Sequence, residues 1–234
     1  MRTVLITGAS GGIGSAAAAR FHEAGYRVVL HYFRNEEAAR RLAESLPGSV
    51  LFRADLSDPG QTEALANAFP ETDVLINNAA VSLFSLFDLV SDEAEKRLYE
   101  INLMAPLRLT RKLLKGMLSR RSGCILNVSS YFGEIGGSCE VDYSVAKAGL
   151  IGMTKALAKE VGPAGVRVNC VCPGIIRTPM NDRLTVEEEQ QLMDEIPLDR
   201  FGDPDEVARV LLFLAGDGAS YINGSVIDVN GGIC

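Results

Sequence analysis

The chain has 234 residues, of which 47% are hydrophobic and 23% charged, and its net charge is −7. This apolar fraction excludes an intrinsically disordered chain, and the acidic balance disfavours a nucleic-acid-binding protein, which needs a basic face. No apolar stretch approaches the about 18 residues of a membrane span, and the first residues do not form a signal peptide. We therefore expect one domain over residues 1–234, in the cytoplasm, without a membrane partner.

Apolar runs of strand length alternate with helical patterns along the whole chain. The strand-like runs cover 3–7, 27–32, 49–54, 73–76, 123–128, 166–171 and 225–229. The helical patterns cover 15–24, 35–46, 58–69, 91–118, 142–161 and 203–214. This alternation predicts an α/β fold, a doubly wound parallel sheet with helices on both faces.

The five cysteines are expected to be reduced thiols in a chain without a secretory signal. Cys170 and Cys172 lie two apart in a strand-like run, so both side chains should enter the core from one face. The two histidines, His22 and His31, match no zinc-ligand spacing. We predict no metal site.

A glycine-rich turn, TGASGGIG at residues 7–14, follows the first strand-like run and opens a helical pattern. Glycines let a backbone approach a pyrophosphate, and a helix N-terminus supplies unpaired N–H groups and partial positive charge. A purely structural turn is the alternative. The position of the glycine-rich turn directly after the first strand predicts a Rossmann-type dinucleotide site. Its expected contacts are Gly8, Ser10, Gly11, Gly12, Ile13 and Gly14.

An arginine follows the second strand-like run, where an NAD site usually has an acid about 20 residues beyond the glycine turn. No acid occurs between Arg27 and Asn35, whereas Arg34 lies on the expected loop. An arginine can clamp a 2′-phosphate, which a carboxylate would repel. The sequence therefore favours NADP(H) over NAD(H), with a solvated loop charge as the alternative role of Arg34.

Asp55 ends the third strand-like run at the same edge of the sheet. Its carboxylate could accept a hydrogen bond from an adenine amino group. It could equally form the turn that leads into Ser57 and Asp58. Both roles stay open at the level of sequence.

Chemically competent side chains follow the fifth strand-like run. Tyr143 and Lys147 lie four apart on a predicted helix, so both project from one face. A free tyrosine has a pKa of about 10, which a neighbouring ammonium group would lower toward neutrality. Ser130, at the end of the fifth strand, could hold a carbonyl oxygen in place. Each feature alone also occurs on ordinary helix surfaces and strand ends.

With these features in this order, the chain resembles the short-chain dehydrogenases/reductases in their compact form, over essentially its whole length. The matching pieces are residues 7–14, Asp55-Leu56, Asn77-Asn78-Ala79, Asn102, Ser130, Tyr143 with Lys147, Pro173-Gly174 and Asn230-Gly231-Gly232. The spacing of thirteen residues from Ser130 to Tyr143 also agrees with that family.

The resemblance implies a role for each matching residue. Tyr143 would be the general acid, Lys147 would lower its pKa and hold the nicotinamide ribose, and Ser130 would orient the substrate carbonyl. Asn102 would anchor a water chain that resupplies protons. Further cofactor contacts would come from Asp55, Leu56, Asn78, Ala79, Pro173, Gly174, Ile176 and Thr178.

One position departs from the family pattern, and one catalytic assignment has an alternative. Ala80 stands where the family usually has a glycine, which adds a methyl group beside the cofactor but removes no catalytic group. Ser129 competes with Ser130 as the catalytic serine, and the family spacing favours Ser130.

Within the family, the chain looks most like the 3-oxoacyl-[acyl-carrier-protein] reductases of fatty acid synthesis. The resemblance implies NADPH-dependent reduction of a 3-oxoacyl thioester carried by an acyl carrier protein. One alternative is a reductase or dehydrogenase of a free ketone, sugar, alcohol or CoA ester. Another is a non-catalytic NADP(H)-binding sensor or scaffold. Relatives are usually homotetramers, so the resemblance also implies four copies.

An acidic carrier protein would need a local basic patch on this acidic chain. The densest cationic stretch is Arg120-Arg121, with Arg111, Lys112 and Lys115 upstream, and it could form this patch. Alternatively, these cations simply occupy the solvated C-terminal end of a helix, where the helix dipole favours them. The resemblance implies that Arg121 is a carrier-contacting arginine, whereas Ala164 lies where some relatives carry a second basic residue.

Residues 179–201 would form a substrate lid in this family. Met180, Leu184, Leu192 and Met193 could line an apolar acyl channel in that lid, with core packing as the alternative.

Overall fold

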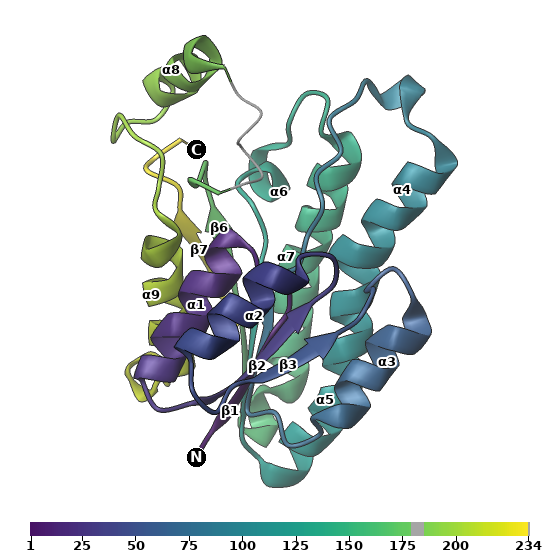
Figure 1. Cartoon of the computed structure of the whole chain (residues 1–234), viewed down its shortest axis with the longest axis vertical. Coiled ribbons are helices and arrows are strands. Elements are labelled where there is room, and N and C mark those ends of the chain that lie inside the picture. The colour runs from purple at the N-terminus through teal and green to yellow at the C-terminus, as the bar shows by residue number, and fades with distance from the viewer. Residues whose placement is uncertain (179–184, 234) are drawn as a thin grey trace.

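The computed structural model describes residues 1–178 and 185–233, which build a parallel sheet covered by helices on both faces (Figure 1). The seven strands are β1 (Thr3–Ile6), β2 (Arg27–Tyr32), β3 (Val50–Arg53), β4 (Val74–Asn77), β5 (Gly123–Val128), β6 (Val166–Pro173) and β7 (Val226–Val229). Their order is β3-β2-β1-β4-β5-β6-β7, and each neighbouring pair is parallel. The predicted α/β class and parallel sheet are confirmed.

The helices lie between the strands in the chain. They are α1 (Gly12–Glu23), α2 (Glu36–Ser45), α3 (Pro59–Ala68), α4 (Asp92–Tyr99), α5 (Ala105–Arg120), α6 (Phe132–Ile135), α7 (Val141–Val161), α8 (Val186–Asp194) and α9 (Pro204–Ala215). Short 3-10 turns cover Phe87–Leu89, Gly162–Ala164 and Asp217–Ala219. No helix in the described ranges combines the length and apolar character needed to cross a membrane.

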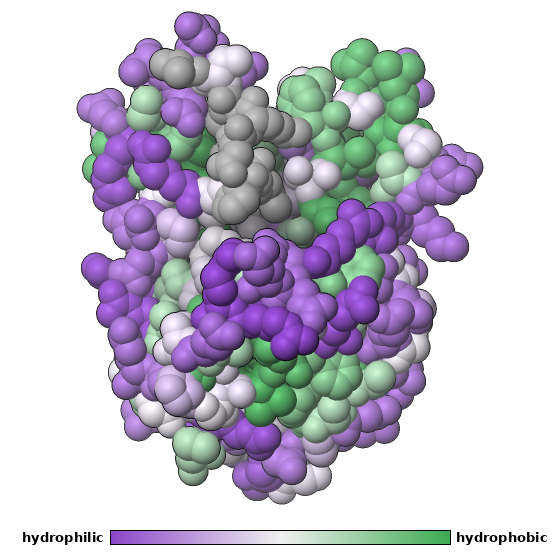
Figure 2. All heavy atoms as spheres, in the orientation of Figure 1, coloured by the Kyte–Doolittle hydropathy of each residue, from purple (hydrophilic) through white to green (hydrophobic). Residues whose placement is uncertain are grey.

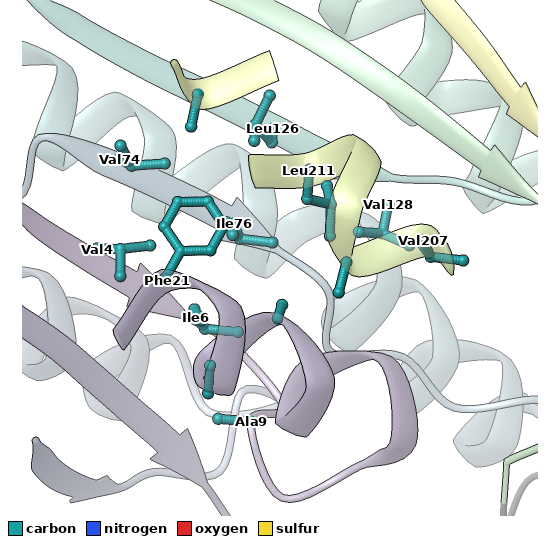
Figure 3. Packing of buried hydrophobic residues seen from close by; sticks show 14 of the residues in the cluster. Val4, Ile6, Ala9, Phe21, Val74, Ile76, Leu126, Val128, Val207 and Leu211 are labelled. Carbon is teal, nitrogen blue, oxygen red and sulfur yellow. The ribbon is translucent and has the colours of Figure 1, made fainter. Parts of the chain in front are cut away.

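Alternate residues of each strand enter the hydrophobic cores on opposite faces of the sheet. Val4 and Ile6 of β1 meet α1 and α9 on one face, where the ring of Phe21 is fully buried (Figure 3). Leu5 points to the other face, which α3, α5 and α7 cover. Burial of a side chain such as Phe21 stabilises the fold by about 1.5–3 kcal/mol. This two-sided burial explains why the strands lack polar alternation.

Polar residues fix where several helices begin. The side chain of Asn35 accepts a hydrogen bond from the Ala38 N–H, and Asp58 caps α3 ahead of Pro59. Asp203 and Glu206 form a reciprocal capping box at the start of α9. These helix starts agree with the predicted patterns at 35–46, 58–69 and 203–214.

The structure of residues 91–118 differs from the one long helix that the sequence pattern predicts. It comprises α4, a π-helical turn at Glu100–Met104 and α5, which continues to Arg120. The π-helical turn contains the buried Asn102, whose side chain bonds outside the helix. Hydrophobic periodicity does not resolve one wider turn between two amphipathic helices.

Of the expected lid over residues 179–201, the structure describes the part from Thr185 onward. Thr185 and Glu188 form a capping box that starts α8, which stands beyond the carboxyl ends of the strands (Figure 1). Leu192 and Met193 pack against a small cluster that includes Ile196 and Phe201, which favours core packing for these two residues. The expected channel residues Met180 and Leu184 lie outside the described residues.

Candidate active site

A cavity of about 570 Å³ opens at the carboxyl ends of the strands, above the junction of β1 and β4. The strand order reverses at this junction, and such a crevice is where doubly wound sheets bind ligands. All but two of the expected site residues line the cavity, and the two exceptions are Gly14 and Asn102. Residues as far apart in the sequence as Gly8 and Thr178 therefore meet in one site.

The glycine-rich turn is held in a conformation that side chains would prevent. Gly8 has φ +67°, and a Cβ atom there would lie 2.9 Å from the Cα of Ala79. A Cβ on Gly14 would lie 2.2 Å from the Gly8 carbonyl oxygen, so Gly14 lets α1 pack against the turn without itself lining the cavity. A Cβ on Gly12 would lie 2.5 Å from Cγ2 of Thr178, which closes the cavity from the other side. The turn therefore exposes backbone to the cavity, as phosphate binding requires.

Thr7 joins this turn to the loop that follows β4. Its Oγ1 accepts hydrogen bonds from the N–H groups of Asn78 at 2.9 Å and Ala79 at 3.0 Å. The side-chain amide of Asn78 donates to the Thr7 carbonyl at 2.9 Å. Asn78 and Ala79 thus face the cavity on a fixed loop. Thr7 was recognised as part of the glycine-rich motif, but its hydrogen bonds to the Asn78 loop were not predicted. They join residues that lie 71 positions apart in the sequence.

His31 is a second residue whose position the sequence did not reveal. It lines the floor of the cavity from β2, and its ring bonds both to Gly8 and to Ala54. A histidine inside the buried run VVLHY was an available signal, because a buried polar side chain needs partners. The comparison of the two histidines with zinc-ligand spacings could not reveal the hydrogen-bond partners of His31.

The end of the cavity beside β2 and β3 is cationic. Arg34 lines it, and the guanidinium carbons of Arg34, Arg53 and Arg97 lie 5.6, 5.9 and 6.0 Å from the ring centroid of Phe33. The Asp55 carboxylate lies beside Arg97 at 3.6 Å. Three guanidinium groups around one ring with one adjacent carboxylate make a local positive field.

Asp55 lines the cavity and also forms a turn. Its Oδ1 accepts hydrogen bonds from the Ser57 N–H at 2.9 Å and the Ser57 hydroxyl at 2.7 Å. Of the two roles left open by the sequence, the structure shows the turn-forming one. Contact with an adenine amino group stays a prediction.

Ser130, Tyr143 and Lys147 meet at the other end of the cavity. The Ser130 side chain lies close enough to the Tyr143 phenol to lower its pKa. Desolvation in the cavity raises the pKa of Tyr143 well above its usual value, and the carboxylate of Glu140 raises it further. The expected lowering of the Tyr143 pKa by Lys147 is therefore wrong for the unliganded protein, because desolvation outweighs it. Tyr143 is protonated at neutral pH, which suits a proton donor.

Lys147 is held rigidly behind Tyr143. Its side chain is 2% exposed, and its Nζ donates to the Val128 carbonyl at 2.8 Å. The same Nζ lies 5.5 Å from the ring centroid of Tyr143. Burial lowers the pKa of Lys147 to about 8, so the ammonium form still predominates near neutrality.

Ser129 has a different role from Ser130. Its hydroxyl donates to the backbone carbonyl of Lys147 at 2.8 Å and is buried. It therefore fixes α7 on β5, while the Ser130 hydroxyl faces Tyr143. This geometry agrees with the expected choice of Ser130.

Asn102 lies beside the cavity and supports one of its loops. Its Oδ1 accepts from the Val81 N–H and its Nδ2 donates to the Val81 carbonyl, both at 2.8 Å. These two bonds fix the chain just beyond Asn78 and Ala79. Its expected part in a water chain stays a prediction.

The segment after β6 closes the cavity near Ser130. The Pro173 carbonyl accepts from the Tyr131 N–H at 3.0 Å. A Cβ on Gly174 would lie 2.7 Å from the Cα of Asn230, so a glycine is needed for this close approach. Ile176 pairs with Gly202 in a short bridge and continues toward Thr178. The expected nicotinamide contacts are thus brought together on one side of the cavity.

Cys170 and Cys172 are fully buried on β6, as predicted. The neighbouring Cys170 thiol, together with burial, raises the pKa of Cys172 above its usual range. Within the described residues, both are free thiols, together with Cys124 and Cys139.

The predicted basic patch lies away from the cavity. Arg120 ends α5 and donates to the Thr72 carbonyl ahead of β4, and Arg121 donates to the Pro163 carbonyl ahead of β6. Both residues therefore sit at the amino ends of the strands. Six residues of β5 separate this edge from the cavity by roughly 20 Å. Both arginines thus lie at the C-terminal end of α5 with backbone carbonyl partners, and their expected role in carrier docking stays a prediction.

Comparisons with known proteins agree with this geometry. A family model described as enoyl-(acyl carrier protein) reductase matches residues 8–234. The uncharacterized oxidoreductase YmfI of Bacillus subtilis is 40% identical over 99% of this chain and 98% of its own length. The 3-oxoacyl-[acyl-carrier-protein] reductase FabG of Rickettsia felis is 39% identical over 99% and 96%, and nodulation protein G of Rhizobium sp. is 41% identical over 99% and 96%. A solved structure described as a short chain dehydrogenase/reductase family protein superposes with TM-score 0.93 at 32% identity, covering 99% of this chain and 96% of that one.

Proposed function

The chain belongs to the short-chain dehydrogenase/reductase family and is an oxidoreductase acting on CH–OH and C=O groups with a nicotinamide cofactor, and from this premise we propose its reaction. In this proposal, the protein uses NADPH to reduce a 3-oxoacyl thioester to its 3-hydroxyacyl form in fatty acid biosynthesis. The thioester is linked to an acyl carrier protein. The observation that carries the proposal is the meeting of Ser130, Tyr143 and Lys147 at one end of a cavity that begins at a glycine-rich turn.

The residues present fit a dinucleotide along the whole cavity. Glycine backbone at residues 8–14 suits a pyrophosphate, and Asn78 with Ala79 forms a fixed wall at its middle. Pro173, Gly174, Ile176 and Thr178 bracket the end nearest Tyr143, where the nicotinamide ring would lie. A bound nicotinamide would supply a hydride to the substrate carbonyl carbon.

Tyr143 is the general acid in this proposal. Its hydroxyl gives a proton to the carbonyl oxygen as the carbonyl becomes an alcohol. The nearby ammonium of Lys147 favours the phenolate that remains. The Ser130 hydroxyl donates a hydrogen bond to the same carbonyl oxygen and stabilises the negative charge that develops there. Asn102, through Val81, holds the loop against which the reactants pack, and it is proposed to anchor the water chain that reprotonates Tyr143.

The cationic adenosine end supports NADP(H) as the cofactor. Arg34 is exposed at the cavity, beside Arg53 and Arg97. A 2′-phosphate would offset the repulsion among these guanidinium groups. Asp55 and Leu56 are proposed to contact the adenine from the end of β3.

The carrier-linked substrate is supported by relatives named as 3-oxoacyl-[acyl-carrier-protein] reductases. Relatives of similar identity are named as an uncharacterized oxidoreductase and as nodulation protein G. Their names favour keeping one second candidate, in which the same residues reduce a free ketone or CoA ester or oxidise a sugar or alcohol.

The experiment that separates these candidates follows NADPH oxidation with matched substrates. A 3-oxoacyl group is presented on an acyl carrier protein, on a short free thioester and on CoA. We expect the highest kcat/KM with the carrier and little turnover when NADH replaces NADPH. Equal kcat/KM for all three forms would contradict carrier specificity, and comparable NADH turnover would contradict the cofactor proposal.

Exposed apolar side chains support the proposal that four copies assemble. Phe84, Leu86, Phe87 and Leu89 are 61%, 58%, 64% and 69% exposed on the loop before α4. Figure 2 shows this hydrophobic area at the upper right, above α4 in Figure 1. Apolar area of this kind marks protein contacts on many surfaces.

A further inference from the structure

A buried histidine supports the glycine-rich turn from below. His31 lies on β2 and is 3% exposed. It lines the cavity, and its ring lies directly against the turn at residues 7–14. The mechanism proposed above does not use it.

The two ring nitrogens of His31 have different partners. Nδ1 accepts a hydrogen bond from the Gly8 N–H at 3.0 Å, and Nε2 lies 3.0 Å from the Ala54 carbonyl oxygen. An amide N–H can only donate and a carbonyl can only accept. The arrangement therefore requires a neutral ring with its hydrogen on Nε2. Burial lowers the pKa of His31 to about 4, with the nearby Asp55 carboxylate partly opposing that shift.

The backbone of β2 strengthens the same connection. The Ala9 N–H donates to the His31 carbonyl at 2.9 Å, and the Ala54 N–H donates to the Tyr32 carbonyl at 3.0 Å. His31 thus joins the glycine-rich turn to the ends of β2 and β3. These three segments surround the adenosine half of the cavity.

A turn of this composition needs such a restraint. Gly8 has φ +67°, and glycine samples both halves of φ space when nothing holds it. Each alternative conformation of a free turn would lower the affinity for phosphate, because only one directs its N–H groups at the ligand. The hydrogen bond from Gly8 to Nδ1 selects that conformation before the ligand arrives.

We propose that His31 is a positioning residue for dinucleotide binding, whose Nδ1 holds the Gly8 amide so that the rest of the turn presents its N–H groups to the pyrophosphate. This inference rests on the proposed function only in requiring a nicotinamide dinucleotide in the cavity. It is independent of Arg34 and of the substrate. The competing role is a histidine that merely fills and stabilises the core.

Two substitutions separate the two bonds of the ring. In His31→Asn, the side-chain oxygen lies where Nδ1 lies and still accepts from Gly8, while the bond to Ala54 is lost. In His31→Gln, the side-chain amide reaches the position of Nε2 and donates to Ala54, while the acceptor for Gly8 is lost. His22→Gln is the matched control, because His22 lies on α1 with its ring bonded to the Pro47 carbonyl.

The measurements are the Kd for NADPH and for NADH, kcat at saturating cofactor and urea unfolding of each variant. We expect His31→Gln to raise both Kd values about tenfold, with kcat changed less than about twofold. His31→Asn should stay within about twofold of the wild type in Kd despite losing one buried hydrogen bond. Equal weakening of binding by Asn and Gln, or unchanged binding in the Gln variant, would overturn the proposal.

A measurement on the unaltered protein covers the case in which a variant does not fold. Nitrogen-15 NMR should show an unprotonated Nδ1 and a protonated Nε2 for His31, with slow exchange of the Gly8 amide. A protonated Nδ1 or a rapidly exchanging Gly8 amide would refute the proposal. A wild-type preference for NADH would contradict the choice of NADP(H) and leave this inference standing, because both cofactors share the pyrophosphate. Binding of neither cofactor would overturn both.

Discussion

The proposed preference for NADP(H) depends on Arg34 at the adenosine end of the cavity. Replacing Arg34 by Ala removes a charge-assisted bond to a 2′-phosphate, which is worth about 1.5–3 kcal/mol. We expect KM for NADPH to rise roughly 10- to 100-fold, with KM for NADH nearly unchanged. Arg40→Ala is the control, because Arg40 is paired with Glu36 on the exposed face of α2. An equal rise in KM for both cofactors would contradict a 2′-phosphate contact.

The charge on Lys147 predicts a pH dependence for carbonyl reduction. Burial places its pKa at about 8, whereas the pKa of Tyr143 lies far higher, so Lys147 is the group of this pair that titrates first as pH rises. Above about pH 8, a neutral amine no longer favours the Tyr143 phenolate, and kcat/KM for reduction should fall with rising pH. A steady-state profile from pH 6 to 10 at constant ionic strength checks this. A profile that stays flat to pH 9.5 would argue against a catalytic ammonium.

Residues whose signals are local could be predicted from the sequence, and residues whose partners are distant could not. The glycine-rich turn and the Tyr143–Lys147 spacing each lie within a few positions, so a pattern reveals them. The bond between His31 and Gly8 spans 23 positions. Hydrogen bonds of that kind are set by strand order and register, which no local pattern encodes.

At the scale of elements, the proposed cofactor site depends on the junction between β1 and α1. A Cβ on Gly14 would lie 2.2 Å from a backbone oxygen of the turn, which cannot move aside without changing the turn itself. Gly14→Ala should therefore weaken NADPH binding by more than tenfold and destabilise the fold by about 1–3 kcal/mol. Titration of NADPH and urea unfolding measure the two effects.

Gly152→Ala is the matched change in α7, where a Cβ would meet nothing within 4 Å. It should leave NADPH binding unaltered and stabilise the helix by about 0.5–1 kcal/mol. Similar effects of the two substitutions on cofactor affinity would contradict the role assigned to Gly14.

Elements with strong periodicity were predictable, and their irregular joints were not. The strands were recognisable as short apolar runs because both faces of the sheet are buried. The π-helical turn at Glu100–Met104 was not, since the partner of its Asn102 is Val81, which lies 21 positions away in the sequence. The four-residue α6 is too short to show a period.

At the scale of the whole molecule, the cavity and the basic stretch lie at opposite edges of the sheet. The cavity lies at the carboxyl ends of the strands, and Arg120 with Arg121 lies at the amino ends. An acidic partner bound at those arginines would stand one strand length from this chain's own cavity. The linear sequence showed a cluster of charge but could not show which edge of the sheet carries it.

The proposed assembly of four copies predicts a mass in solution. Four times the chain mass of 25.1 kDa is about 100 kDa. Light scattering after size-exclusion chromatography should give that mass, because the exposed Phe84, Leu86, Phe87 and Leu89 would otherwise stay in water. A single species of 25.1 kDa would contradict the assembly.

The central claim is that Tyr143 delivers the proton in a nicotinamide-dependent carbonyl reduction, and kcat of Tyr143→Phe tests it most directly. The substitution removes only the hydroxyl, and Tyr221→Phe on the exposed surface is the matched control. We predict that kcat for the 3-oxoacyl substrate falls about 100- to 10,000-fold, with the Kd for NADPH within about twofold of the wild type and the control unchanged. A Tyr143→Phe variant that keeps the wild-type kcat would contradict the account.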